Sequence, residues 1–383
     1  MNRYMFDFYK NKSIFITGHT GFKGSWMCRA LAEMGAKVTG YSLVPPTVPS
    51  LYDEAGIDRD VKSVIGDIRD YDTLNKAFFE AEPEIVIHMA AQPIVRDSYK
   101  NPRYTYETNV MGTVNILECV REYNDAHRKA GDGKAIKSFL NVTTDKVYLN
   151  REWERGYKED DELDGYDPYS NSKSCSELVT HAYMRSFFSG VIVRLDNVCT
   201  EELSSDGNLF INYIPAISTA RAGNVIGGGD FANDRIIPDC VRAVIKGDDI
   251  IIRNPLSFRP FQHVLEPVFA YLMISMKQYE DRDFEGYYNV GPDVEDCINA
   301  GQMADLFVKF WGEGSKWINK SDNGPHEANF LHLDCTKLKK TFGWAPVWNV
   351  EIAVQKTVEW YKVWRDKGDV RAFMTEQIKD FGM

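Results

Sequence analysis

A tyrosine and a lysine in the stretch YSNSK provide the first candidate chemistry. Tyr169 and Lys173 stand four positions apart, in a helical pattern that extends from Tyr169 to Phe188. Residues with this spacing share one face of a helix, so both side chains can reach the same site. A free phenol titrates near pH ~10 and is a poor base at neutrality, but a cation held beside it favours the phenolate. Because Tyr-x-x-x-Lys occurs by chance in many helices, other motifs must place this pair beside a substrate.

A second set of reactive side chains lies at the end of an apolar run. The run SFLNVTT predicts a strand, and the residues from Thr143 to Lys146 form the stretch TTDK at its end. Ligands of open α/β sheets gather at the carboxyl ends of strands, so these side chains are expected in a site. Thr144 can hydrogen-bond a substrate hydroxyl, and Asp145 and Lys146 can serve as general acid and base if their surroundings tune them. The alternatives are a structural turn carboxylate for Asp145 and a solvated lysine for Lys146.

A glycine-punctuated loop, GHTGFKG, follows the apolar run SIFIT and opens a helical pattern. Gly18 and Gly21 allow a tight turn and a close approach of the backbone to a pyrophosphate, and Gly24 lets the helix pack near the strand. The N–H groups and the positive dipole end of that helix then face the phosphates. A plain turn is the alternative, because the GxxGxxG spacing alone is weak. The predicted cofactor-binding residues of the loop are Gly18, His19, Thr20, Gly21, Phe22, Lys23 and Gly24.

The residues expected to hold the adenosine half of a dinucleotide are only partly present. Ser42 and Leu43 follow the second apolar run, KVTGY, where an Asp or Glu usually binds the ribose. No arginine replaces that acid, so this position does not separate NAD from NADP. Asp67, in GDIRD, is a candidate partner for the adenine edge, together with Ile68. A helix N-cap or a surface carboxylate is the alternative for Asp67.

These motifs require a sheet that presents strand ends on one edge. The sequence alternates short apolar runs with helical patterns, which predicts a right-handed, doubly wound parallel sheet of the Rossmann type in an α/β protein. The predicted strands are SIFIT, KVTGY, SVIG, EIVIHMA and SFLNVTT, and the predicted helices cover Ser25–Met34, Asp72–Ala81, Arg103–Asn124 and Tyr169–Phe188.

After about Val191 this alternation breaks down. VIVRLDNV and IPAISTARAGNVIGGGD both resemble a strand that enters a polar loop, which leaves the register of the sixth strand ambiguous. PLSFRPFQHV, YYNVG and LKKTFGWAP are interpreted as parts of a smaller α/β substrate lobe. The predicted division is an NAD-binding domain over residues 1–190, with return strands around 214–226, and a substrate lobe over 227–383, with an interleaved boundary.

The composition excludes several function classes. The net charge of −11 argues against a general nucleic-acid binder, which needs a basic face to neutralise phosphates. The seven scattered cysteines form no CxxC pair, which predicts reduced thiols in a cytoplasmic protein and no metal site. No run approaches the ~18 apolar residues of a membrane span, so a soluble protein is expected.

The three motifs, in this order, resemble the extended short-chain dehydrogenase/reductase family. Longer strings narrow the resemblance to the CDP-glucose 4,6-dehydratases, and the similarity covers roughly residues 10–365. The strings that carry it are TGHTGFKGSW, GDIRD, HMAAQPIVR, TNVMGTVNILE, DKVYLNREW, GYDPYSNSK, RAGNVIGGGD, RPFQHVLEP and LDCTKLKKTFGWAP.

The resemblance implies a lyase with an internal redox loop that uses NAD. Thr144 and Tyr169 would address the sugar 4-hydroxyl, and Tyr169 would remove its proton while hydride leaves C4. The 4-ketone acidifies C5–H, so that water is lost across C5 and C6, with Asp145 protonating the departing 6-hydroxyl. Hydride then returns to C6 and a proton to C5, which gives CDP-4-dehydro-6-deoxy-D-glucose from CDP-D-glucose. Lys146 stands where dTDP-sugar relatives have a glutamate taken as the C5 base, and it must lose a proton to act.

The resemblance also implies contacts to the substrate. Asn224, Arg235, Arg259 and His263 match positions that resemble pyrophosphate and nucleotide contacts, and arginine suits anions through its fork of donors. Surface salt bridges are the alternative for the two arginines, and packed or locally bonded side chains are the alternative for the other two.

Further cofactor contacts follow from the same resemblance. Ala90 and Ala91 are small where the backbone passes the nicotinamide side, although core packing explains them nearly as well. The predicted cofactor set outside the glycine loop is Asp67, Ile68, Ala90, Ala91, Gln92, Thr143, Tyr169 and Lys173.

Three expectations remain open at this point. An epimerase or decarboxylase of the same fold would share Tyr169 and Lys173 without needing an acid at Asp145, and a non-catalytic nucleotide-binding module is a further alternative. Helices that begin at Arg103 and Tyr169 could pair between subunits, as in relatives, which predicts a homodimer or homotetramer. A segment near residues 189–213 makes the chain longer than the family pattern, beside the expected nucleotide pocket, and casts doubt on base selectivity.

Overall fold

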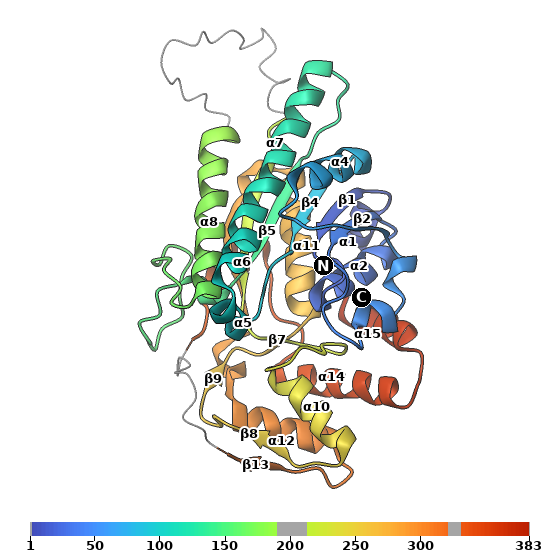
Figure 1. The fold of residues 1–383 in the computed structure, drawn as a ribbon, viewed down its shortest axis with the longest axis vertical. Helices are drawn as coiled ribbons and strands as arrows, with labels where there is room; N and C mark the ends of the chain where they lie inside the picture. The colour runs from blue at the N-terminus through green and yellow to red at the C-terminus, as the bar shows by residue number, and fades with distance from the viewer. Residues whose placement is uncertain (1, 190–212, 321–330, 383) are drawn as a thin grey trace.

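A computed structural model describes residues 2–189, 213–320 and 331–382 (Figure 1). The extra segment near 189–213 and the apolar run VIVRLDNV therefore lie, almost entirely, outside the described residues. Within the described part of the chain, no helix is both long enough and apolar enough to cross a membrane.

The centre of the protein is a seven-stranded sheet in the order β11-β6-β5-β4-β1-β2-β3, and every neighbouring pair is parallel. This arrangement confirms the doubly wound parallel sheet. All five strands predicted before residue 150 form at their expected places. The strands of the sheet are β1 Ser13–Thr17, β2 Lys37–Ser42, β3 Lys62–Ile65, β4 Ile85–His88, β5 Ser138–Thr144, β6 Ala216–Ala222 and β11 Gly286–Val290.

Helices cover both faces of the sheet. The principal helices are α1 Asn2–Tyr9, α2 Phe22–Glu33, α3 Leu51–Glu54, α4 Tyr71–Ala81, α5 Val95–Lys100, α6 Pro102–Tyr106, α7 Gly112–Ala130, α8 Pro168–Phe187, α10 Ile236–Lys246, α11 Leu265–Glu280, α12 Ala300–Trp311, α13 Thr336–Phe342, α14 Val350–Arg365 and α15 Val370–Gly382. The remaining short strands are β7 Val225–Ile226, β8 Ile250–Ile252, β9 Phe258–Arg259, β10 Gln262–His263, β12 Ile298–Asn299 and β13 Trp317–Asn319.

The alternation of side chains along each strand builds two cores. Ile14 and Ile16 of β1 belong to the core that contains Trp26 of α2, whereas Phe15 belongs to the core that contains Phe78 of α4. Successive strand residues point to opposite faces, so a run that is apolar throughout must be covered on both sides. This explains why the inner residues of the two strands, Ile14 to Ile16 in β1 and Ile85 to Ile87 in β4, are all apolar and buried.

The helix predicted over Arg103–Asn124 is longer and less regular than expected. It consists of α6, a π-helical turn over Glu107–Met111 and α7, which continues to Ala130. Gly131, with φ 64°, ends α7 in the left-handed conformation that glycine adopts readily.

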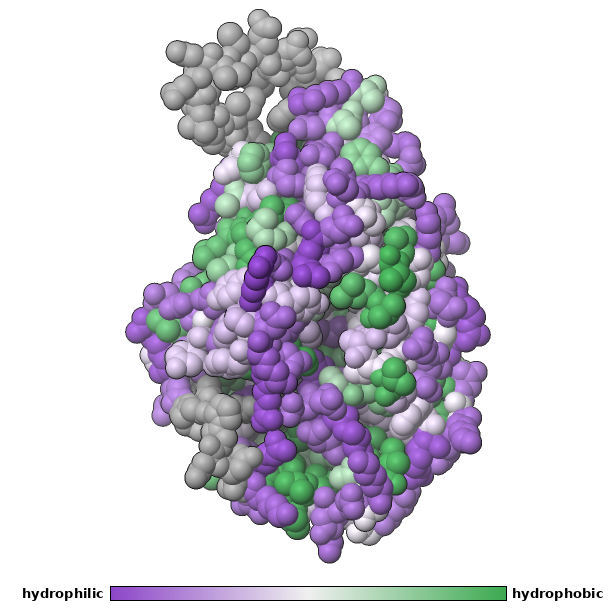
Figure 2. Space-filling view, viewed as in Figure 1, coloured by the Kyte–Doolittle hydropathy of each residue, from purple (hydrophilic) through white to green (hydrophobic). Residues whose placement is uncertain are grey.

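The lobe lies at the carboxyl ends of the strands. In Figure 1, α10, α12, β8 and β13 form the lower part of the molecule, below the sheet. In Figure 2 the same face is largely hydrophilic and is hollowed where the lobe meets the sheet-bearing part.

The structure corrects one interpretation of the C-terminal half. YYNVG was interpreted as part of the lobe, but it forms most of β11, which pairs with β6 and completes the sheet. The physical reason is α11, which returns the chain to the sheet and packs against β5 and β6. IPAISTARA supplies β6, paired with β5 from Ala216 opposite Ser138. The division at residues 190 and 227 stays a prediction.

Candidate active site

The glycine loop brings three backbone segments into close contact. Gly18 has φ 82°, and a Cβ built there would lie 2.8 Å from the amide nitrogen of Ala90. A Cβ on Gly24 would lie 2.1 Å from the carbonyl oxygen of Gly18. Gly21 is the N-cap of α2 and makes no side-chain capping hydrogen bond. The first amide groups of α2 are thus available to an anion, and only glycine fits at Gly24.

Two predicted cofactor residues of this loop point inward. His19 is fully buried, and its Nε2 lies 2.7 Å from Oγ of Ser63. Burial lowers the pKa of His19 to about 4. Thr20 is also buried, and its hydroxyl lies 2.9 Å from Oγ of Ser42 and donates to the carbonyl of Leu43 at 2.9 Å. These side chains hold the loop against the end of β2 and the body of β3, so a contact of either residue to a cofactor would come from its backbone.

Lys23 carries an ammonium group into the centre of the site. Burial lowers its pKa to about 8, and the charge of Arg235 acts in the same direction. The carboxylates of Asp145 and Asp230 oppose this effect. Lys23 therefore lies near the candidate acid. The ring of its neighbour Phe22 packs against Gly227, where an added Cβ would lie only 3.1 Å from it.

Asp67, the predicted adenine contact, is engaged in an ion pair. Its Oδ2 lies 2.6 Å from Nη2 of Arg69, and a hydrogen bond from Arg69 lowers the pKa of Asp67 despite partial burial. The N-cap alternative for Asp67 is wrong, because Asp70 caps α4. Ile68 is buried against α7, where a Cβ on Gly112 would lie 2.8 Å from its Cγ2.

The turn after β4 is fixed by hydrogen bonds. Ala90 and Ala91 are partly exposed. The amide of Gln92 donates to Oδ1 of Asn109 at 2.8 Å, and its side chain bonds both the carbonyl and the amide of Ile94, at 3.1 and 2.6 Å. The Gln92 side chain therefore closes its own loop, and Ala90 and Ala91 are the members of this set that border open space.

The end of β5 presents a buried carboxylate. Asp145 is 1% exposed, and its Oδ1 accepts a hydrogen bond from the hydroxyl of Thr144 at 2.9 Å. Its Oδ2 has no hydrogen-bond partner among the described residues, and a Cβ on Gly223 would lie 2.4 Å from that oxygen. Thr143 faces elsewhere, because its hydroxyl donates to Glu177. A buried oxygen without a partner in the protein is a natural position for exchanging a proton with a ligand.

Tyr169 lies next to this carboxylate. Its phenol and the hydroxyl of Thr144 form a hydrogen bond. Burial raises the pKa of Tyr169 to about 12, with Asp145 acting in the same direction and Thr144 and Arg235 in the opposite one. In the chain alone, burial therefore outweighs the positive charges that act on this phenol.

Lys173 is held by the sheet. Its Nζ donates to the carbonyl of Val142 at 3.0 Å, and the residue is 4% exposed. Burial lowers its pKa to about 8, although the carboxylate of Glu177 opposes the change. Lys146 is more accessible, and its amide donates to the hydroxyl of Thr144 at 3.4 Å.

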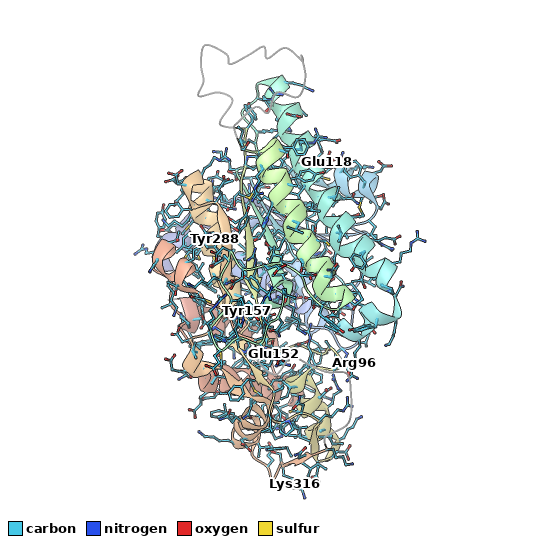
Figure 3. The ribbon with its side chains drawn as sticks, turned by 90° about the vertical axis from the view of Figure 1, so that its left-hand side faces the viewer. Arg96, Glu118, Glu152, Tyr157, Tyr288 and Lys316 are labelled. Atoms are coloured by element: carbon cyan, nitrogen blue, oxygen red, sulfur yellow. The ribbon has the colours of Figure 1, made fainter. Side chains whose placement is uncertain are left out.

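One of the predicted substrate contacts lies close to this centre. Nη1 of Arg235 pairs with Oδ2 of Asp230 at 2.7 Å, and the charge of Asp230 raises the pKa of Arg235. Beside it, Arg96 of α5 pairs with Asp234 at 3.1 Å and joins the lobe to the sheet-bearing part. Figure 3 shows Arg96 just below the lower end of α8.

The other predicted substrate contacts are more varied. Arg259 is partly exposed in β9, and its Nη1 donates to the carbonyl of Phe258 at 2.6 Å. The carbonyl of Asn224 accepts from the amide of Gln262 at 3.1 Å, so its backbone is fixed while the residue is partly exposed.

His263 is packed in the core. It is fully buried, and its ring lies edge-on to Trp348 at 4.8 Å and to Trp26 at 5.9 Å. Burial lowers its pKa to about 3. This packing favours the structural alternative for His263 over a contact to substrate.

Two charged residues near the site were missed. Glu177 and Arg221 are fully buried and pair at 2.9 Å, next to Thr143 and Lys173. The sequence contains a signal for each: Glu177 lies one turn after Lys173 on the same helix face, and Arg221 is the only charge in the apolar run IPAISTARA.

Comparisons with known proteins place the chain among nucleotide-sugar enzymes. A family model described as GDP-mannose 4,6 dehydratase matches residues 15–357. A CDP-glucose 4,6-dehydratase of Salmonella typhimurium is 44% identical over 376 residues, which cover 98% of this chain and 97% of the relative. A probable dTDP-glucose 4,6-dehydratase of Sinorhizobium fredii is 27% identical and covers 91% of this chain and 92% of its own length.

Solved structures support the fold. A dTDP-glucose 4,6-dehydratase of Bacillus anthracis in complex with NAD has a TM-score of 0.69 at 20% identity, over 93% of this chain and 98% of that chain. A UDP-glucose 4-epimerase of Thermotoga maritima with UDP-glucose has a TM-score of 0.72 at 20% identity, over 91% of this chain and 98% of that chain. Dehydratases and epimerases therefore share this architecture, and the fold alone does not separate them.

Proposed function

The chain belongs to the GDP-mannose 4,6-dehydratase family, and from this membership we propose that it is an NAD-dependent lyase that converts CDP-D-glucose to CDP-4-dehydro-6-deoxy-D-glucose and water. The observation that carries the proposal is the 44% identity, over nearly the full length of both chains, with a CDP-glucose 4,6-dehydratase. The side chains at the end of β5 and the start of α8 supply the groups that this reaction requires.

The glycine loop fits NAD. The contacts that a Cβ would make at Gly18 and Gly24 mean that backbone, and no side chain, lines the path of a pyrophosphate, and the uncapped start of α2 offers amide donors. Bound there, NAD supplies a hydride acceptor and donor and the positive charge of its nicotinamide ring. Lys173 and the backbone around Ala90 and Ala91 would orient the nicotinamide half.

Tyr169 is proposed to remove the proton of the sugar 4-hydroxyl. Its pKa of about 12 must fall for this task. Arg235 lowers it in the chain, and the charges of a bound nicotinamide ring and of Lys173 would have to lower it further. Thr144 bonds the Tyr169 phenol, so it can bind the same sugar hydroxyl and hold it at the phenolate.

Asp145 and Lys146 are proposed to perform the elimination. Oδ2 of Asp145 has no hydrogen-bond partner among the described residues, so it can donate a proton to the departing 6-hydroxyl, which leaves as water. Lys146, partly exposed beside it, would accept the proton from C5. Arg235 is proposed to bind the pyrophosphate of the substrate, with Arg259 and Asn224 as further nucleotide contacts and His263 as a packing residue behind them.

The domains and the assembly are proposals of the same kind. Residues 1–190 with the return strands would bind NAD, and 227–383 would cover the nucleotide sugar. We propose a homodimer, with a homotetramer as the larger option, through α7 and α8, because Leu178 and Phe187 are 52% and 56% exposed on α8. The six described cysteines are free thiols, which fits a cytoplasmic enzyme.

Product analysis with CDP-, dTDP- and GDP-glucose side by side tests the function. The expected result is loss of water from CDP-glucose and a 4-keto product that absorbs in alkali, with much slower conversion of the other two. A sugar isomer without loss of water would favour an epimerase instead. No conversion of any of the three, with NAD bound, would refute the assignment.

A further inference from the structure

A buried carboxylate lies one helical turn beyond Lys173. Glu177 of α8 is fully buried, and its Oε2 accepts from Nη2 of Arg221 at 2.9 Å and from the hydroxyl of Thr219 at 2.7 Å. Its Oε1 accepts from the hydroxyl of Thr143. Nε2 of His181, on the same helix, lies 3.3 Å from Oε2. Burial raises the pKa of Glu177, but Arg221, His181 and Thr143 together bring it well below its usual range. Glu177 is therefore a carboxylate bound to β5, to β6 and to Arg221.

Arg221 extends this contact to the loop that follows β5. Its Nη1 donates to the hydroxyl of Tyr148 at 2.7 Å and to the carbonyl of Glu159 at 2.9 Å. Tyr148 in turn donates to Oδ1 of Asn289 in β11 at 2.7 Å. The ion pair thus joins the helix that carries Tyr169 to the two strands at the edge of the sheet.

Several charged or titratable groups face the ammonium of Lys173. Glu177 lies on the same helix, Lys23 comes from the start of α2, and His88 lies at the end of β4. The charge of Lys23 lowers the pKa of Lys173, and that of Glu177 raises it. The pKa of His88 is itself lowered to about 3 by burial and by Lys173, so His88 is neutral near neutrality. The carboxylate of Glu177 is then the one negative group among these that favours the charged lysine.

From these contacts we propose that Glu177 and Arg221 form a positioning pair: Glu177 keeps Lys173 charged against the end of β5, and Arg221 holds that carboxylate in place. The proposal rests on the proposed function, because the role of Lys173 is to orient the cofactor and support the Tyr169 phenolate. Neither member of the pair is proposed to touch substrate.

A purely structural role explains the pair poorly. A buried ion pair loses the hydration of both charges, and replacing it with apolar residues of similar volume is often neutral or stabilising. Arg221 and Glu177 lie between β5, β6 and α8, where the pair also bonds the hydroxyls of Thr219 and Tyr148. Retaining two charges there is better explained by the third charge, Lys173, on the next turn of the helix.

Two variants test the proposal through opposite shifts. Glu177→Gln removes the negative charge, so the pH at which Lys173 loses its proton should fall by about one unit. Arg221→Met leaves the carboxylate uncompensated, so that pH should rise by a similar amount. Two measurements report the pH at which Lys173 loses its proton. One is the alkaline limb of the single-turnover oxidation of CDP-glucose, and the other is the pH dependence of the Kd for NAD.

The controls separate charge from stability. Arg29→Met breaks another buried ion pair, in which Arg29 of α2 lies 3.0 Å from Asp60. This change should lower the Tm without moving either pH midpoint. The double variant Glu177→Gln, Arg221→Met removes both charges and should shift the midpoints less than either single change. Thr219→Val, which removes one donor to Glu177, should shift them slightly upward and serves if a single variant does not fold.

Unchanged midpoints in the folded variants, or shifts of the same sign, would overturn the proposal and leave the pair structural. The NAD measurement needs no turnover, so the outcome stays readable if wild-type protein fails to convert CDP-glucose. In that case the proposed function falls, while the opposite shifts of NAD affinity still support the positioning pair.

Discussion

Tyr169 is subject to opposing influences in the site. Burial and Asp145 raise its pKa, whereas Thr144 and Arg235 lower it. We expect the phenol to become an effective base only when further positive charge arrives, which would couple its ionisation to cofactor binding. This coupling would protect the buried site from carrying a phenolate when no hydride acceptor is present.

The first prediction concerns the hydroxyl of this residue. Tyr169→Phe should reduce oxidation at C4 by about a thousandfold, because general base catalysis typically contributes 10²–10⁴-fold. Formation of reduced nicotinamide in a single turnover measures the effect. Tyr166→Phe is the matched control, because Tyr166 is 96% exposed three residues earlier and should keep wild-type rates. Equal rates for the two variants would remove Tyr169 from the mechanism.

Asp145 allows the two halves of the reaction to be separated. Asp145→Asn should still permit reduced nicotinamide to accumulate, while loss of water slows by about a hundredfold or more, because only elimination needs the acid. Rapid-quench product analysis resolves the two steps. The exposed Asp164→Asn provides a control with the same chemical change. If both steps keep their rates in Asp145→Asn, the carboxylate is structural.

Lys146 can be tested as the C5 base in the same way. Lys146→Met should suppress exchange of the C5 hydrogen with solvent deuterium while C4 oxidation continues, because the methionine side chain cannot accept a proton. Mass spectrometry of recovered sugar measures the exchange. Persistent exchange at the wild-type rate would assign the base to another group.

Among single residues, the sequence could predict those whose spacing places them on one helix face and those that follow a strand. Tyr169, Lys173 and Asp145 were selected as candidates in this way, and their roles stay predictions. The inward orientation of His19 and the packing of His263 could not be predicted, because each depends on partners far away in the chain, Ser63 and Trp348. Each of the missed charges has a signal in the sequence. Glu177 has a helical spacing from Lys173, and Arg221 is a lone charge in a strand, but the two signals were not combined.

At the scale of elements, the glycine loop predicts how an added Cβ changes stability and NAD binding. Gly24→Ala should destabilise the protein by about 1–3 kcal/mol and abolish NAD binding, because the new Cβ would lie 2.1 Å from the carbonyl of Gly18. Gly21→Ala is the comparison, since its Cβ would lie 3.4 Å from the same oxygen and should leave the free energy of unfolding nearly unchanged. Urea unfolding and calorimetric titration with NAD measure the two effects.

Strands and helices of the first half could be predicted because their apolar patterns are local. The π-helical turn over Glu107–Met111 could not, since it depends on tertiary contacts: Asn109, within it, donates to the carbonyl of Gln92 at 3.1 Å and to the hydroxyl of Ser172 at 2.9 Å. The pairing of β11 with the central sheet could not be predicted for a related reason. A short apolar run does not reveal which sheet it joins when the chain has left that sheet and returned.

For the whole molecule, the three most deeply buried histidines of the described residues predict sensitivity to acid. Burial lowers the pKa of His19 to about 4 and the pKa values of His88 and His263 to about 3. In the unfolded chain each titrates near ~6.5, so the unfolded state binds protons first as the pH falls, and stability is lost from pH ~6.5 downward. At about pH 5 each histidine should reduce the free energy of unfolding by about 2 kcal/mol.

Urea unfolding at pH 7 and at pH 5 measures this loss. The free energy of unfolding should be several kcal/mol smaller at the lower pH, with an unchanged dependence on urea. A free energy that is equal at the two pH values would mean that these imidazoles become protonated without unfolding.

The position of β11 has a consequence for damaged genes. The chain leaves the sheet after β6, builds much of the lobe, and only then adds its last strand beside β6. A frameshift between residues 230 and 285 would therefore remove β11 as well as much of the substrate-covering lobe. It would turn β6 into a bare margin with unpaired backbone groups, which is a template for strand addition by another chain. Such truncated products are expected to aggregate and be degraded rather than persist as an isolated nucleotide-binding half.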